Sequence, residues 1–286
     1  MNKNISNADK AEVLIQALPY IQKYHDKIIV IKYGGNAMVN EDLKKAVMTD
    51  IVLLHQIGIK VVLVHGGGLE INQTLEKMQI PTRFVNGLRQ TDKEAVNVVQ
   101  MVLAGKVNKD LVNLLENSGG NAMGICGIDG HLLEAKSLSE ELGFVGEIIS
   151  VNVKPVLDLL EKNYIPVIST IGYDRESNVY NINADTAAAK IAAALKADSL
   201  ITLTDIKGIL RDKHDDNTLI PTITAAEAPK LIKKGVIEGG MIPKVECCVD
   251  AVNSGVKRVF IIDGRVPHSI LIEVLSDQGI GTMFLA

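Results

Sequence analysis

Short apolar runs alternate along the chain with segments in which apolar positions recur at helical spacing. The runs are rich in Val and Ile and are as long as buried strands: IIVIKY (28–33), KVVLVH (60–65), YIPVIS (164–169), SLITLT (199–204) and RVFIID (258–263). Residues 41–58 and 183–197 instead have the period of amphipathic helices. Residues 127–136 and 144–151 resemble a hairpin inserted into the first half. This pattern predicts an α/β fold with an open, mainly parallel sheet sandwiched between helices.

The first 26 residues predict an extra helix before the first strand. Apolar residues recur there at helical spacing, and Ser6-x-x-Asp9 has the form of a capping box. Pro19 lies inside this pattern and lacks a backbone N–H, so we expect a kink in the helix. An apolar stripe on such a helix is expected to pack on the body of the protein or on another subunit.

Composition narrows the possible functions. The 286 residues are 47% hydrophobic and 22% charged, with a net charge of −4, so there is no basic field to attract nucleic acid. Cys126, Cys247 and Cys248 form no CxxC pair, which argues against a zinc site or a redox motif. The N-terminus lacks an apolar signal core, and no run approaches the ~18 apolar residues of a membrane span. We therefore expect a cytoplasmic protein without a membrane partner.

Two glycine-rich loops follow predicted strands. The strand at 60–65 runs into Gly66, Gly67 and Gly68, and the strand at 28–33 ends with Lys32 shortly before Gly34 and Gly35. Glycines between a strand and a helix let backbone N–H groups point at a bound anion. Because parallel strands end at one edge of the sheet, the two loops are expected to form one anion site.

The loops do not match the common nucleotide or hydrolase motifs. The Walker A pattern GxxxxGK[ST] and the dinucleotide pattern GxGxxG are both absent. HGGG also occurs in the oxyanion hole of lipases and esterases. That function requires a GxSxG nucleophile, and no serine in this chain has glycines at both positions, so a hydrolase is excluded.

Further polar residues occur where an α/β fold places a site. Arg89 in NGLRQT offers a fork for a carboxylate, and Lys244 ends the motif EGGMIPK. Asn181 and Asp185 stand at the start of the helix predicted from NINADTAAAK. An Asp in the first turn of a helix also occurs simply as compensation for the helix dipole.

The motifs IKYGGNA, VHGGG, NGLR, NINAD, TDIKGIL and GGMIPK occur in the order found in the amino acid kinase family, and the resemblance covers residue 27 to the end. The combination of NGLR, NINAD and GGMIPK is most similar to members that phosphorylate the side-chain carboxylate of N-acetyl-L-glutamate with ATP in arginine synthesis. The resemblance implies an N-terminal helix (1–26), an N-terminal lobe that binds the amino acid and forms a dimer (27–193), and a C-terminal lobe that binds ATP (194–286).

The resemblance also implies three groups of site residues. The groups that act on the transferring phosphoryl group are Lys32 and Lys244, with Asp185 between them. The amino acid would be bound by Gly66, Gly67, Arg89 and Asn181, with backbone amides of Gly35, Gly66 and Gly67 also cradling phosphate oxygens. ATP would be bound by Gly34, Gly35, Asp205, Gly239, Gly240 and Met241. The nucleotide is expected with Mg²⁺, and no protein side chain is expected to ligate the metal.

Such a reaction needs no general base. A carboxylate with an ordinary pKa near ~4.3 is already an ionised nucleophile at neutral pH. The difficulty is to bring an anion against a polyanion, which positioning and positive charge achieve. His65, before the glycines, is therefore interpreted as a structural histidine.

The two ends of the chain resemble those of arginine-inhibited members. They imply a homo-hexamer, a trimer of dimers joined by interlaced N-terminal helices, with arginine bound between that helix and the C-terminal lobe. The candidate arginine residues are His268, Glu273, Gly279 and Gly281, although Glu273 could equally lie on a solvated helix face. Binding of a PII-type signalling protein stays open.

Three alternatives remain. An acetylaminoadipate kinase would differ in substrate by one methylene, which is worth only ~1–3 kcal/mol of discrimination. Aspartokinase, glutamate 5-kinase, carbamate kinase and UMP kinase share the lysines and glycine loops. A catalytically inactive arginine sensor is the alternative from another class, but both lysines and Asp185 are retained.

Overall fold

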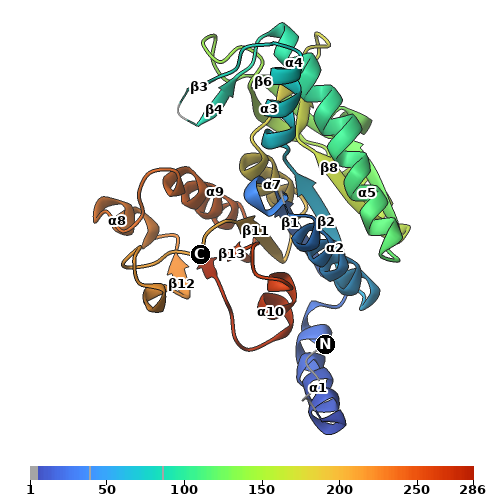
Figure 1. Cartoon of the computed structure of the whole chain (residues 1–286), viewed down its shortest axis with the longest axis vertical. Coiled ribbons are helices and arrows are strands. Elements are labelled where there is room, and N and C mark those ends of the chain that lie inside the picture. The colour runs from blue at the N-terminus through green and yellow to red at the C-terminus, as the bar shows by residue number, and fades with distance from the viewer. Residues whose placement is uncertain (1–5, 39, 86) are drawn as a thin grey trace.

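The computed structural model describes residues 6–38, 40–85 and 87–286 (Figure 1). The residues 1–5 of the expected N-terminal helix segment and the first residue of the NGLR motif lie outside this description. Nothing is described of the side chains at positions 36 and 37.

An eight-stranded sheet forms the centre of the molecule. Neighbouring strands run parallel except β13 and β14. Their order is β12 (Thr222–Thr224), β14 (Thr282–Leu285), β13 (Arg258–Asp263), β11 (Ser199–Thr204), β1 (Ile28–Tyr33), β2 (Lys60–His65), β8 (Ile165–Ser169) and β5 (Ala122–Cys126). All five predicted strands belong to this sheet, and the prediction of an open, mainly parallel sheet is confirmed.

Helices cover both faces of the sheet, and β1 shows why. Ile29 and Ile31 belong to one core cluster while Val30 belongs to the other, because successive side chains of a strand point to opposite faces. The first cluster includes residues of α2 (Glu41–Gln56), α5 (Asn108–Asn117) and α10 (Ser269–Leu275). The second includes residues of α6 (Lys154–Glu161), α7 (Ala184–Ala194) and α9 (Met241–Asn253). A strand buried on both faces is rich in apolar residues, and in β1 only Lys32 is charged.

The sheet is continuous across the expected boundary of the two lobes. β1 of the N-terminal segment pairs with β11 of the C-terminal segment, and Ile29 lies opposite Ser199. The expected division at residues 193 and 194 falls within the last turn of α7. The division into two lobes therefore stays a prediction.

A smaller sheet and a hairpin lie beside the N-terminal half of the main sheet. The small sheet has the order β10 (Val179–Asn181), β9 (Ile171–Tyr173), β6 (Leu133–Ser137) and β7 (Gly146–Val151). β6 and β7 pair antiparallel, as expected from residues 127–136 and 144–151. The hairpin consists of β3 (Arg83–Val85) and β4 (Leu88–Gln90), and it carries Arg89.

One helical segment has a form that its sequence does not indicate. Between α4 (Lys93–Gln100) and α5 the chain makes a π-helix, η2 (Met101–Val107). A π-helix is rare and changes the direction of the following side chains relative to an α-helix. Leu103 in this segment is 1% exposed and faces the glycine loop after β2.

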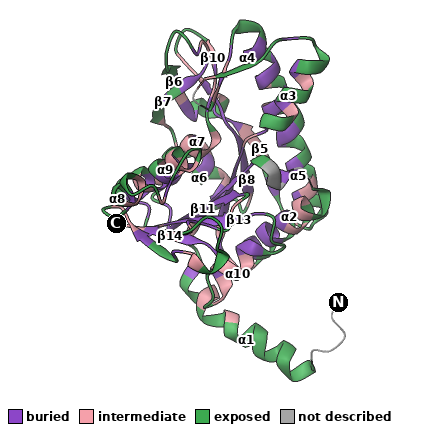
Figure 2. Cartoon of the chain, turned by 60° about the vertical axis from the view of Figure 1, so that its left-hand side comes forward, coloured by how far each residue is buried: buried purple, intermediate pink, exposed green. Residues whose placement is uncertain are grey.

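The predicted N-terminal helix, α1 (Asn7–Tyr24), extends from the body of the molecule (Figure 2). Its capping box is confirmed: the Asp9 N–H donates to Ser6 Oγ at 3.1 Å, and the Ser6 N–H donates to Asp9 Oδ2 at 3.2 Å. The helix continues through Pro19, and the kink there stays a prediction. Only its last turn is buried, at Tyr24, whereas Val13 and Leu14 are more than 60% exposed. Among the described residues, no helix is long and apolar enough to cross a membrane.

Candidate active site

Two lysines from distant parts of the chain meet on one carboxylate. Lys32 lies near the end of β1, and Lys244 lies in the first turn of α9. Asp185 stands between them in the first turn of α7. The Lys32 Nζ atom is 2.8 Å from Asp185 Oδ1, and the Lys244 Nζ atom donates a hydrogen bond of 2.7 Å to Asp185 Oδ2. The carboxylate therefore holds two ammonium groups close together.

Burial makes this cluster electrostatically strong. The Lys32 and Asp185 side chains are 8% and 14% exposed, and that of Lys244 is 28% exposed. Burial by itself would raise the pKa of Asp185, but the charges of Lys32 and Lys244 and the hydrogen bond from Lys244 outweigh it. They lower the pKa of Asp185 to about 2, so the carboxylate is ionised at neutral pH. The cluster carries one net positive charge from two lysines and one aspartate.

The N-terminus of α7 adds to this positive region. The Asn183 side chain caps the helix by accepting hydrogen bonds from the backbone N–H groups of Asp185 and Thr186. The remaining N–H groups and the helix dipole favour an anion at this end. Asp185 is thus more than dipole compensation, because its carboxylate contacts both lysines.

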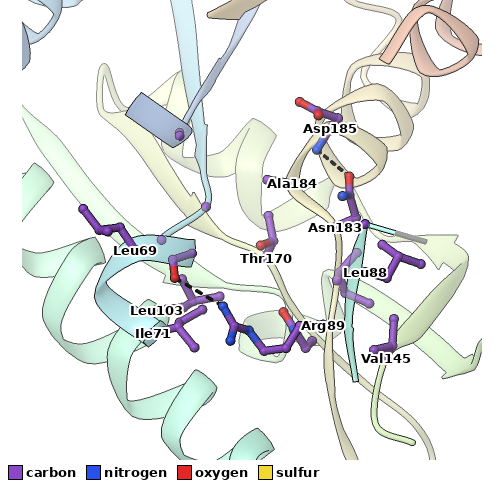
Figure 3. Close-up of a pocket in the computed structure, with 18 of the residues that line it drawn as sticks. Leu69, Ile71, Leu88, Arg89, Leu103, Val145, Thr170, Asn183, Ala184 and Asp185 are labelled. Atoms are coloured by element: carbon purple, nitrogen blue, oxygen red, sulfur yellow. Dashed lines mark hydrogen bonds between the residues drawn. The ribbon is translucent and has the colours of Figure 1, made fainter. Parts of the chain in front are cut away.

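A cavity of about 250 Å³ begins at this cluster (Figure 3). Figure 3 shows Arg89 and Asp185 well apart on its lining. The structure brings together at this cavity most of the residues expected around the amino acid and the phosphoryl group: Lys32, Gly34, Gly35, Gly66, Gly67, Arg89, Asn181 and Asp185. A small amino-acid derivative fits such a volume, and a whole nucleotide does not.

The glycines at this cavity have more than one reason to be glycine. A Cβ atom at Gly67 would lie 2.7 Å from Leu103 Cδ2, and one at Gly66 would lie 3.3 Å from the Ala184 side chain. At these positions neighbouring side chains of the protein itself leave little room for a Cβ atom, which is a reason for glycine besides the binding of an anion. Gly35 has φ +69°, which strains any residue with a side chain.

The Gly66 amide is already used in this structure. Its N–H donates to the Tyr33 carbonyl at 3.1 Å, which links the ends of β1 and β2. This bond counts against the Gly66 N–H as a donor to phosphate, although the residue lines the cavity. The sequence alone does not indicate this bond, because it depends on the pairing of β1 with β2.

Arg89 forms the other end of the cavity. Its side chain is nearly buried and donates to Thr82 Oγ1, Asn72 Oδ1 and the Gly68 carbonyl. Burial lowers the pKa of Arg89, but a guanidinium stays protonated in proteins. Asn181 lies on the neighbouring β10 and donates to Thr91 Oγ1 at 3.3 Å. A buried cation with an amide nearby is suited to a carboxylate.

Sequence reasoning missed several residues of the lining. Leu103, Val145 and Thr170 line the cavity together with Leu88 and Asn183. No motif indicated Leu103, because it reaches the site only through the π-helix. Thr170 directly follows β8, so the rule that sites form at the carboxyl edge of a parallel sheet could have found it.

A second, larger cavity of about 930 Å³ lies in the C-terminal half. Asp205, Gly239 and Met241 line it, as expected for the nucleotide residues, but Gly240 does not. Lys207 and Arg265 line it too, and both are held by carboxylates: Lys207 Nζ lies 2.5 Å from Asp216 Oδ2, and Arg265 forms two bonds of 2.9 Å with Asp263. Gly34 and Gly35, also expected at the nucleotide, line the first cavity.

His65 is buried, consistent with a structural role. Its Nδ1 atom lies 2.9 Å from the Gly66 carbonyl and its Nε2 atom lies 3.1 Å from Asn108 Nδ2. Burial lowers the pKa of His65 to about 4, so the ring is neutral at neutral pH. Within the described residues, no group of three or more His, Cys, Asp and Glu side chains is arranged to hold a metal ion.

The four candidate arginine residues lie at or near α10. The Glu273 Oε2 atom accepts hydrogen bonds from the Ile280 and Gly281 N–H groups, and a Cβ atom at Gly279 would lie 3.2 Å from Glu273 Oε1. His268 instead lies at the N-cap of α10 and bonds Asp50. None of these four described residues lines either cavity. Glu273 is thus tied to the turn after α10.

The sequence of the chain is similar to those of one protein family. The model of the amino acid kinase family matches residues 27–263. The acetylglutamate kinase of Brachyspira hyodysenteriae is 57% identical over 284 residues, covering 99% of each chain. That of Clostridium beijerinckii is 51% identical over 282 residues, covering 98% of this chain and 99% of its own.

Among solved structures, N-acetylglutamate synthase from Neisseria gonorrhoeae, complexed with coenzyme A and N-acetyl-glutamate, superposes with a TM-score of 0.86 at 25% identity. The match covers 96% of this chain, which spans 63% of that one. The chain belongs to the amino acid kinase family.

Proposed function

We propose that the protein transfers the γ-phosphoryl group of ATP to the side-chain carboxylate of N-acetyl-L-glutamate, in the biosynthesis of arginine. The observation that carries this proposal is the pair of lysines held by Asp185. Lys32 and Asp185 line one end of a small cavity and the Arg89 cation lines the other, while Lys244 is joined to this end through Asp185. The two relatives compared above, both acetylglutamate kinases, support the substrate.

In the proposed reaction, a side-chain carboxylate oxygen of the substrate attacks the γ-phosphorus. A new bond forms between them, the bond from phosphorus to the bridging oxygen breaks, and ADP leaves with the electron pair. Charge accumulates on the transferring group, where Lys32 and Lys244 stabilise it. Asp185 holds both ammonium groups in place before the substrate arrives, which lowers the cost of ordering them.

The rest of the cavity would bind the substrate. Arg89 and Asn181 would take the α-carboxylate and the neighbouring amide group, because both line the cavity and offer N–H donors. Figure 3 shows Arg89 well apart from Asp185. Backbone amides of Gly35 and Gly67 and the N-terminus of α7 would face phosphate oxygens. This arrangement places the reacting carboxylate toward Lys32.

The larger cavity would hold the nucleotide. Asp205, Gly239 and Met241 would contact adenosine. Lys207 and Arg265 also line this cavity, each paired with a carboxylate. Mg²⁺ would enter with ATP and neutralise part of the phosphate charge. We assign it no side-chain ligand.

For regulation, we propose that arginine inhibits the enzyme by binding between α1 and the region of His268, Glu273, Gly279 and Gly281. We also propose that α1 joins dimers into a homo-hexamer in the cytoplasm. The support for assembly is the apolar stripe of α1, where Val13, Leu14, Ile15 and Leu18 are 49–74% exposed. The support for the arginine site is that α1 contacts α10, which contains Glu273 and has His268 at its N-cap.

The test is an assay of ADP release with Mg-ATP and N-acetyl-L-glutamate, with and without millimolar arginine. We expect activity that arginine suppresses. Activity without inhibition would contradict only the regulatory part. Activity with N-acetyl-2-aminoadipate or with glutamate, but not with N-acetyl-L-glutamate, would show that the substrate is that other amino acid. Binding of arginine without any turnover would support a catalytically inactive sensor.

A further inference from the structure

The guanidinium of Arg89 is held by three acceptors of its own chain. Nη1 donates to Thr82 Oγ1 at 2.7 Å. Nη2 donates to Asn72 Oδ1 at 2.6 Å and to the Gly68 carbonyl at 3.2 Å. These contacts use three of the five N–H groups of the guanidinium. Its orientation toward the cavity is therefore set by neighbours.

Asn72 is the side chain that, together with the Gly68 carbonyl, connects Arg89 to a rigid element. Asn72 and Gly68 are four residues apart on α3 (Gly68–Lys77), so they lie on the same face of the helix. Arg89 is on the hairpin of β3 and β4, where Phe84 is 51% exposed and stacks on the guanidinium at 4.7 Å. A hairpin exposed in this way does not by itself fix a long side chain, whereas α3 begins at the glycine loop of the cavity.

The acceptor at position 72 is uncharged. An amide oxygen orients a guanidinium but leaves its positive charge available for a substrate carboxylate. An aspartate of the same shape would form a charge-assisted pair with Arg89 and compete with the substrate. An asparagine at this position is therefore compatible with the binding of a carboxylate by Arg89, whereas an aspartate would oppose it.

We propose that Asn72 is a positioning residue for substrate recognition: its amide oxygen orients Arg89 toward the α-carboxylate of the amino-acid substrate without neutralising the guanidinium. The inference rests on the proposed function and adds to it a residue that determines how the carboxylate is bound. Asn72 acts through Arg89 and takes no part in phosphoryl transfer.

The test compares Asn72→Ala and Asn72→Asp with a control, Gln73→Ala, at the next exposed position of α3. With N-acetyl-L-glutamate and Mg-ATP, we expect Asn72→Ala to raise the KM for the amino acid about tenfold, with kcat changed less than about twofold. Asn72→Asp should raise this KM about 50-fold, although it keeps the shape and the acceptor. The KM for ATP should stay unchanged, and Gln73→Ala should match the wild type.

A second substrate separates positioning from a structural role. 4-Acetamidobutanoate keeps the acetamido group and the reacting carboxylate but lacks the α-carboxylate. Its kcat/KM should be the same in the wild type and both Asn72 variants, because Arg89 has no carboxylate to bind. A purely structural role would lower kcat/KM for both substrates.

The outcomes are distinct. An Asn72→Asp enzyme with the wild-type KM would overturn the inference and leave the proposed function standing, and so would equal losses with both substrates. A wild-type enzyme without activity on N-acetyl-L-glutamate would refute the proposed function and this inference with it. If Asn72→Ala fails to fold, Asn72→Asp carries the test, since its shape is that of Asn.

Discussion

Asp185 and Asp50 are both buried carboxylates, but their surroundings give them opposite tendencies. Asp185 contacts two lysines, which lower its pKa to about 2 against the effect of burial. Asp50, in α2, is fully buried, and its Oδ1 atom lies 2.6 Å from the His268 Nδ1 atom. Burial raises the pKa of Asp50 to about 6, although the hydrogen bond and charge of His268 oppose this. Burial alone therefore does not decide whether a carboxyl group is charged, because neighbouring charges and hydrogen bonds act against it to different extents.

The difference suits the two locations. At the active site the charge of Asp185 is held over the whole physiological range, so that the two lysines keep their positions. Asp50 joins α2 to the N-cap of α10, and its charge changes near pH 6. The charge of Asp185 thus stays the same over this pH range, whereas Asp50 makes the contact between α2 and α10 sensitive to pH.

Removing either lysine of the active site should have the largest effect. Lys32→Ala and Lys244→Ala are each expected to lower kcat at least about 100-fold, with a smaller change in KM, because each removes charge that stabilises the transition state. Steady-state kinetics with the ADP-release assay would measure this. Lys154→Ala, which breaks an exposed ion pair with Asp158 on α6, is the matched control. A Lys32 or Lys244 variant with more than about a tenth of the wild-type kcat would contradict the role of that lysine.

The pH dependence of stability should have opposite signs at the two carboxylates. For Asp50 the folded pKa is raised, so its stabilising contribution is present below about pH 4 and is lost as the pH rises through 6. In Asp50→Asn this loss of stability with rising pH should disappear, because asparagine does not ionise. The free energy of unfolding of the variant, relative to wild type, should rise by on the order of 2 kcal/mol between pH 4 and pH 7. Urea unfolding at both pH values would measure it, and a constant difference would show that Asp50 is not protonated near pH 6.

Asp185 should show the reverse trend. Its folded pKa is lowered, so its stabilising contribution is present above about pH 4 and is lost as the pH falls toward 2. At pH 6 the free energy of unfolding of Asp185→Asn should therefore be lower than that of wild type. This difference should shrink by on the order of 1–2 kcal/mol between pH 6 and pH 3. The same urea series tests this. If the gap between the two proteins widened on acidification, the lysines would not be the partners that keep Asp185 ionised.

Truncating α1 should affect catalysis least. Deletion of residues 1–22 removes the exposed apolar stripe but keeps Tyr24, whose ring is buried and lies 5.1 Å from the Arg258 guanidinium carbon. We expect a dimer by light scattering, kcat within about twofold of wild type, and little inhibition by arginine. His268→Ala in the full-length chain is the companion variant, because it disturbs α10 without removing α1. A truncated protein that stays hexameric would refute the role of the helix in assembly.

The sequence predicts the main sheet well because local pattern and tertiary environment agree there. A parallel strand is buried on both faces, so IIVIKY and SLITLT consist largely of aliphatic and β-branched residues, and each matches the bounds of its strand. The same holds for the capping box of α1, which depends on residues three apart. Lys32, Asp185 and Lys244 were expected from motifs, and the strand and helix ends that carry them meet at one edge of the sheet.

The sequence does not indicate the contacts that depend on distant segments. The π-helix that brings Leu103 against Gly67 has no local signature, since its residues would also form an α-helix. The bond from the Gly66 N–H to the Tyr33 carbonyl and the hold of Asn72 on Arg89 each join separate loops or elements. Asp50 and His268 are 218 residues apart, and each alone would pass for a surface residue.

By itself, then, the sequence determined the kind of fold, the order of its strands along the chain and the residue types available for phosphoryl transfer. These follow from periodicity and from backbone requirements that act over a few residues. Only the tertiary structure decided how strongly each carboxylate is held in its ionised form, that the Gly66 N–H is already hydrogen-bonded, and which neighbours hold Arg89. Such properties depend on burial and on the partners that folding brings together, and neither is encoded within a short stretch of chain.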